Sequence, residues 1–91
     1  MHQDQSIRNK VALKAYKQSI SRYIRSAMVL KGIKYDKLTK LLSDIGIELS
    51  SDNLRSKVSK GLFSADLLVA IIDVLEVEQQ ALPEILKQVK Q

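Results

Sequence analysis

A polar stretch in the middle of the chain carries the side chains best suited to bind another molecule. Residues 50–68 read SSDNLRSKVSKGLFSADLL, and at helical spacing only Leu54 and Val58 of residues 51–60 point inward. The outward side chains are Asp52, Asn53, Arg55, Ser56, Ser59 and Lys60, with Lys57 on the flank. Asn and Arg can form paired hydrogen bonds with adenine and guanine edges in the major groove, and lysines can contact phosphates. The pattern therefore fits either a solvated helix or a helix that contacts an acidic partner such as DNA.

The basic charge of the chain lies almost wholly in its first two-thirds. Residues 1–60 hold 13 Lys and Arg against 5 Asp and Glu, whereas residues 61–91 hold 2 against 5, and the net charge is +5. Such segregation is typical of an electrostatic footprint for phosphate, although lysine also serves simply to keep a surface soluble. Lys34, Tyr35 and Lys37 stand at the start of the preceding predicted helix, where they could add phosphate contacts. Tyr35 could equally cover the N-terminal end of that helix without contacting a phosphate.

Residues that could support catalysis or bind a metal are few. The single histidine is His2, near the terminus, and there is no cysteine. The carboxylates of the last third are scattered along one predicted helix and its end, at Asp66, Asp73, Glu76 and Glu78. A glycine-rich phosphate loop and an activated-serine motif are both absent from the sequence. We therefore predict a protein that is not an enzyme, with no catalytic residue, no cofactor and no metal site.

The composition favours one folded domain. Ninety-one residues, 45% of them hydrophobic, are enough for a single core. No apolar run reaches the length of a membrane span, and the first ten residues, MHQDQSIRNK, lack the apolar core of a signal peptide. The sequence thus predicts a single domain over residues 1–91 in the cytoplasm, with no membrane partner and no evident small-molecule ligand.

Three glycines divide the chain into helices. Each precedes an aliphatic residue, the pattern of a Schellman ending, at Gly32-Ile33, Gly46-Ile47 and Gly61-Leu62. The hydrophobic spacing predicts helices over about residues 6–31, 35–45, 51–60, 64–76 and 83–89, and no segment has the alternation of a strand. The first helix should be long and unbroken, with a core stripe made of Leu13, Tyr16, Ile20, Tyr23, Ile24, Ala27 and Leu30.

The helix starts also have recognisable signals. Ser50 and Ser64 stand at N-cap positions, and an apolar residue before each helix can staple onto the fourth helical residue, in the pairs Ile33–Leu38, Leu49–Leu54 and Phe63–Leu68. The helix over residues 64–76 is apolar nearly all round, which predicts that it is central and that Phe63 is buried. We expect residues 1–5 to be disordered and the core to lie within residues 12–76.

The order of these elements resembles that of helix-turn-helix domains of the Cro/lambda-repressor type. An apolar-rich helix that ends at a glycine occupies residues 35–46. It is followed by a serine-rich polar helix over residues 51–60, a glycine at residue 61 and a buried helix over residues 64–76. More closely, RSAMVLKGIKYDKL, NLRSKVSKG and FSADLL together resemble a family of small bacterial proteins of unassigned function that is grouped with helix-turn-helix proteins. The resemblance covers about residues 20–80. It departs from the usual pattern at Ser43, where a glycine is common, and in the four-residue spacing from Leu54 to Val58.

These observations predict an all-α, compact five-helix bundle with an extended first helix and a helix-turn-helix motif made by the second and third helices. The resemblance implies a sequence-specific double-stranded DNA-binding protein, a small transcriptional regulator that inserts residues 51–60 in the major groove. The expected DNA-contacting residues are Lys34, Tyr35, Lys37, Asn53, Arg55, Ser56, Lys57, Ser59 and Lys60. A homodimer is one possible form, because a single helix-turn-helix unit usually needs two half-sites for useful affinity.

A protein-interaction module is the main alternative. The first helix has a second apolar set, away from its main stripe, that could pair with a second copy or a partner and consists of Ile7, Val11, Ala15 and Val29. That set is interrupted by Lys14, Arg22 and Arg25. RNA binding through stacked tyrosines ranks third, because Tyr16 and Tyr23 fall on the predicted core stripe.

Overall fold

The protein is built from five helices, which are the only regular elements within residues 2–90, the part that the computed structural model describes. They are α1 (His2–Lys31), α2 (Tyr35–Asp44), α3 (Ser51–Lys60), α4 (Ala65–Leu75) and α5 (Ala81–Val89). The predicted all-α, five-helix architecture is therefore confirmed. Within residues 2–90, no helix combines the length and the apolar character that crossing a bilayer needs.

Most helix boundaries agree with the sequence to within two residues, and the start of α1 differs most. Helix α1 begins at His2, before the predicted residue 6, so residues 2–5 belong to it. The remaining part of the expected disorder falls on residue 1, outside the described residues. Helix α5 begins at Ala81, which places Pro83 in its first turn, where the missing backbone N–H costs little.

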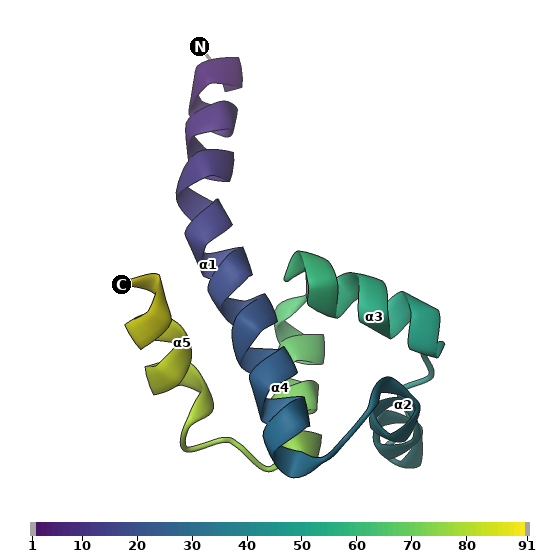
Figure 1. The fold of residues 1–91 in the computed structure, drawn as a ribbon. Coiled ribbons are helices and arrows are strands. Elements are labelled where there is room, and N and C mark those ends of the chain that lie inside the picture. Colours follow the sequence, from purple (N-terminus) through teal and green to yellow (C-terminus); the bar gives the residue numbers. More distant parts are fainter. Residues whose placement is uncertain (1, 91) are drawn as a thin grey trace.

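Helix α1 is much longer than the body of the protein that it supports. Thirty residues at 1.5 Å per residue span about 45 Å, which matches the longest dimension of the molecule, 45 Å. All side chains of residues 5–16, here called the arm, are exposed, whereas the burial of α1 begins at Ser19. Figure 1 shows the arm, in purple, extending well past the other helices.

The predicted core stripe of α1 is correct only for the part of the helix that has neighbours. Leu13 and Tyr16 are 50% and 45% exposed, because the arm extends past the helices that would cover them. Leu30 is 83% exposed, because no described part of the chain covers that side of the last turn. Met28, which was not predicted as a core residue, is buried.

The second half of α1 is the central element of the fold. It packs against α5, α3 and α4, while α2 packs against α3 and α4. The core contains Tyr23, Ile24, Ala27, Met28, Leu38, Leu42, Leu54, Val58, Ile71, Leu75, Val77, Ala81 and Ile85. The core thus runs past the predicted limit at residue 76, because α5 returns along α1 and the buried Ser19 hydroxyl donates to the Ile85 carbonyl oxygen at 2.6 Å.

Helix α4 is not central, although it is apolar nearly all round. Only Ile71 and Leu75 are buried in it, and Val69 on its outer side is 64% exposed. Phe63, before its first turn, is half-buried rather than buried. A small domain has too few helices to cover every face of α4, so the apolar composition overestimates its burial.

The three predicted glycine endings are confirmed. In each, the glycine has a positive φ and the next residue donates its N–H five residues back, as in Ile33 to Met28 at 2.8 Å. Glu76 ends α4 in the same way with φ 58°, an ending that the sequence did not signal because no glycine is present.

The two serine caps differ. Ser50 accepts a hydrogen bond from the Asn53 N–H at 3.1 Å, as predicted. Ser64 stands at the N-cap position of α4, as predicted, but its side chain makes no capping hydrogen bond to the backbone. Its hydroxyl instead joins the Leu67 N–H in donating to the Asp66 carboxylate, and both bonds hold the pKa of Asp66 below its ordinary value.

Candidate nucleic-acid interface

Helix α3 is held firmly at both ends by neighbouring helices. At its start, the Ser51 hydroxyl donates to the Asp36 carboxylate in the first turn of α2 at 2.6 Å. At its other end, Gly61 packs so closely on the backbone of Lys17 in α1 that a Cβ at this position would overlap it. The Ser21 hydroxyl of α1 donates to the Ser59 carbonyl oxygen at 3.3 Å. These contacts fix the direction of α3, which leaves its outer face to present side chains.

One flank of α3 gathers four of the predicted side chains around a hollow of about 250 Å³. The lining residues are Asn53, Ser56, Lys57, Lys60 and Leu62. Asn53, Ser56 and Lys60 are exposed, and Lys57 is half-buried, because its stem covers the edge of the core. Two ammonium groups, an amide and a hydroxyl therefore face the same hollow.

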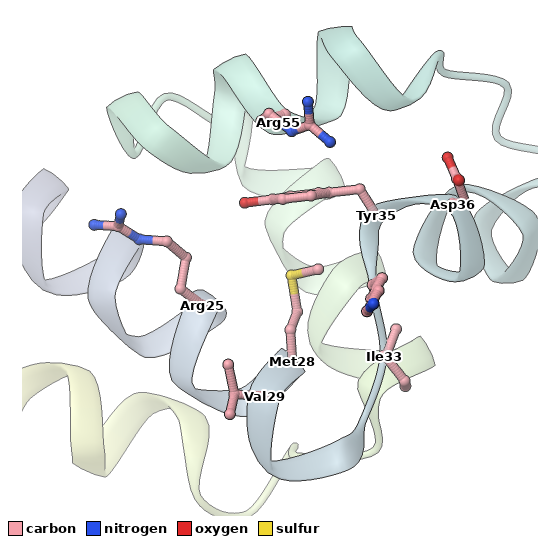
Figure 2. Close-up of a pocket in the computed structure, with 8 residues that line it drawn as sticks. Arg25, Met28, Val29, Ile33, Tyr35, Asp36 and Arg55 are labelled. Carbon is pink, nitrogen blue, oxygen red and sulfur yellow. The ribbon is translucent and has the colours of Figure 1, made fainter.

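The opposite flank is organised by Arg55 and Tyr35. The Arg55 guanidinium lies over the Tyr35 ring, 5.1 Å from its centroid, which is the geometry of a cation–π contact. Figure 2 shows the ring between Arg55 above and Met28 below, with Arg25 of α1 at the side and its guanidinium turned away from the ring. Arg55 also has Asp52 at 3.9 Å, a pair too exposed to contribute much stability.

A pocket of about 390 Å³ opens beside this contact. It has an apolar floor and a charged rim, with lining residues Arg25, Met28, Val29, Ile33, Lys34, Tyr35, Asp36 and Arg55. Three of the rim groups are cationic and one is the carboxylate of Asp36, which is already bound to Ser51. The rim therefore favours negatively charged groups.

The structure brings eight of the nine predicted residues onto or beside α3 and leaves one apart. Lys34 and Tyr35 join Arg55 on one flank, and Ser59 is exposed on the outer face. Lys37 is exposed but lines neither of these two hollows. Two residues after Tyr35, it lies about 200° round α2 from that ring.

Sequence reasoning missed the acidic and basic residues that other helices bring to the site. Arg25 was named only as a residue that interrupts the second apolar set of α1, yet it lines the same pocket as Arg55. No local spacing signals this neighbour, because it depends on how α1 crosses α3. Asp36, which was not among the predicted site residues, holds the start of α3.

The side chains of the site suit reversible hydrogen bonding and charge pairing rather than covalent chemistry. Amide, guanidinium, hydroxyl and ammonium groups dominate both flanks of α3. Among the side chains that the structure describes, no three of His, Cys, Asp and Glu gather where they could hold a metal ion.

Residues 16–80, well over half of the chain, match the model of one protein family, described as a domain of unknown function (DUF6471). The chain belongs to the DUF6471 family. The matched DUF6471 segment contains α2, α3, α4 and the packed half of α1, so both flanks of α3 lie inside it. The expected resemblance to a family of unassigned function is consistent with this match, whereas no helix-turn-helix family is shown. No curated protein and no solved structure matches the chain.

Proposed function

We propose that this DUF6471 protein is a sequence-specific double-stranded DNA-binding protein, a small transcriptional regulator that acts in the cytoplasm. In this proposal α2 and α3 serve as a helix-turn-helix unit, and α3 enters the major groove. The observation that carries it is that α3 is anchored at both ends while its polar outer face stays exposed. A fixed helix with a free face is what base readout requires, because the side chains must reach base edges in one register.

The side chains of the outer face support the proposal by their size and their donors. Ser56 and Ser59 are short, so the backbone of α3 can approach the floor of the groove closely. Asn53 and Arg55 carry the donor pairs that match adenine and guanine edges. The Tyr35 ring holds the Arg55 guanidinium in place before binding, which reduces the entropy lost when the side chain contacts a base.

The distribution of charge supports backbone contacts on both sides of the groove. Lys34 and Arg25 lie beyond Arg55 on one flank, and Lys57 and Lys60 lie on the other. We assign these four side chains to phosphates and Arg55 to a base. Lys37, which points away from Arg55 round α2, is a weaker candidate than the sequence suggested.

The connection between α2 and α3 differs from the usual helix-turn-helix turn. It covers residues 45–50, whereas three or four residues are typical. In this protein the angle of α3 therefore depends on the Ser51–Asp36 bond and the Gly61–Lys17 contact rather than on a tight turn.

The decisive experiment is selection of bound sequences from random duplex DNA, followed by binding titrations at two salt concentrations. Arg55→Ala should weaken the selected site by about 1–3 kcal/mol and relax the preference at one position. Lys60→Ala should weaken all duplexes about equally and lower the salt slope by about one. Lys90→Ala, just after the end of α5, is the control of equal charge and should change neither. An unselective pool, or binding that does not weaken as salt rises, would contradict the proposal.

A protein-interaction module is a second candidate, favoured by one observation. Ile7, Val11 and Val29 are 60%, 69% and 82% exposed on the side of α1 that the sequence marked as a second apolar set. Such a stripe can bury itself against a second copy, which would also supply two half-sites. Sedimentation of the wild type and of the Val11→Ser variant, compared with their duplex binding, distinguishes the interaction module from the DNA-binding protein. Self-association that Val11→Ser removes, without any duplex binding, favours the interaction module.

A further inference from the structure

No side chain of the arm, residues 5–16, is buried by another described part of the chain, and the charged side chains of these residues are all cationic. Every side chain of residues 5–16 is exposed, and the segment carries Arg8, Lys10 and Lys14 with no Asp or Glu. Lys10 and Lys14 are four residues apart, a spacing at which like charges destabilise a helix. Packing does not stabilise the exposed arm, so a partner that stabilises it would do so by neutralising its cations.

Two contacts define which side of α1 faces α3. The Ser21 hydroxyl binds the Ser59 carbonyl oxygen at 3.3 Å, and the backbone of Lys17 touches Gly61 just after α3 ends. The side of α1 that carries Ser21 and Lys17 is thus the α3 side. Figure 1 shows that α1 continues past this end of α3 as the arm.

Helical spacing places two of the three arm cations on that same side. Lys10 and Lys14 precede Lys17 and Ser21 by seven residues each, so each lies about 20° round the helix from its reference residue. Arg8 precedes Lys17 by nine residues, which places it about 180° away. Arg25 also lies on this side of α1, toward the other end of the helix, since it follows Lys14 by eleven residues and is again about 20° away.

We infer that the arm is a second DNA-contacting element, in which Lys10 and Lys14 bind backbone phosphates beside the end of α3 that carries Lys60. This inference rests on the proposed function. Seven residues of helix span about 10 Å, so Lys10 extends the contact about three base pairs beyond the level of Lys17. A second copy fits the arm less well, because self-pairing brings two sets of cations together, whereas a phosphate backbone neutralises them.

The test compares single alanine variants of the arm lysines with a matched control. Lys10→Ala and Lys14→Ala each remove one charge on the α3 side, and Arg8→Ala removes one on the opposite side. The affinity of each chain is measured against the selected site with long flanking duplex, at several salt concentrations from 50 to 200 mM. All three changes favour the helix, so circular dichroism should show no loss of folding.

We expect each lysine variant to lower the slope of log affinity against log salt by about 0.9. Each loss reduces the drop in affinity between 50 and 200 mM salt by about 3.5-fold. Arg8→Ala should keep the wild-type slope. Shortening the duplex on the arm side, so that the three base pairs reached by Lys10 are absent, should weaken the wild type and erase its advantage over the Lys10 variant.

The outcomes separate this inference from the proposed function. If the wild type binds DNA with strong salt dependence and all three variants keep its slope, the arm inference is wrong and the role of α3 stands. Equal losses in all three variants also overturn it, because they would reflect net charge alone. If the wild type binds no duplex, the proposed function fails first.

Discussion

Gly61 offers the sharpest test of the packing that directs α3. It ends α3 with φ 63°, and a Cβ added there would overlap the carbonyl oxygen of Lys17 and lie 2.8 Å from its carbonyl carbon. Gly32 ends α1 with a similar φ of 68°, but a Cβ there would meet nothing within 4 Å. Alanine at Gly32 therefore measures the cost of the left-handed backbone alone, and alanine at Gly61 adds the cost of the clash.

The expected costs follow from these two situations. Gly32→Ala should destabilise the protein by about 1 kcal/mol, since only the conformational term applies. Gly61→Ala should cost about 3–5 kcal/mol, because the added methyl meets backbone, which moves only if α3 and α1 separate. Each kcal/mol lowers the melting temperature of a chain of this length by about 4–8 °C. The melting temperatures of the two variants should therefore differ by about 8 °C or more.

The assay is thermal unfolding followed by circular dichroism, with urea titration to obtain the free energy of unfolding. Equal shifts in the two variants would refute the reasoning, because they would mean that α1 and α3 are not in contact at Gly61. A larger loss in Gly32→Ala would refute it as well.

Three further changes test other parts of the structure. Burial, and then the charge of Glu84, raise the pKa of Tyr23. The folded state therefore favours the neutral phenol and loses stability as pH rises above about 10. In urea titrations Tyr23→Phe should remove this alkaline loss of stability, whereas Tyr16→Phe, at a half-exposed position, should not. Glu76→Gly should stabilise the fold by about 0.5–1 kcal/mol, since it relieves φ 58° in a non-glycine residue, and an unchanged melting temperature would argue against that strain. Phe63→Ala should cost about 1–3 kcal/mol, less than a buried phenylalanine would, and a cost above 4 kcal/mol would show deeper burial than the structure has.

The parts of the fold that depend on local signals were predictable from sequence. Each glycine ending involves a left-handed residue and a hydrogen bond five residues back, so the signal and its effect lie within one turn. The limits of α3 follow from Ser50 and Gly61 for the same reason. The ending at Glu76 was not predictable, because tertiary packing of Val77 imposes a conformation that glutamate does not favour.

The extent of the core was harder to predict than the helices. Periodicity identifies which side of α1 is apolar, but it contains no information on where the neighbouring helices stop. Leu13 and Tyr16 continue the stripe and yet face solvent, because α5 and α3 reach only the second half of α1. The site has the same limitation: α3 and its polar face were predictable, whereas Arg25 joins Arg55 only through the crossing of two helices that are distant in sequence.

The two proposed DNA-contacting elements depend on a single packing joint. The Gly61–Lys17 contact and the Ser21–Ser59 hydrogen bond set the direction of α3 relative to the arm. In the intact fold, Arg55→Ala and Lys14→Ala share no partner, so their effects on affinity should be additive. In a Gly61→Ala background, kept folded at low temperature, α3 must move away from α1, and one straight duplex can no longer engage both elements. The Lys14→Ala change should then cost much less affinity than it does in the wild type, and an unchanged cost would mean that the arm binds DNA independently of how α3 is placed.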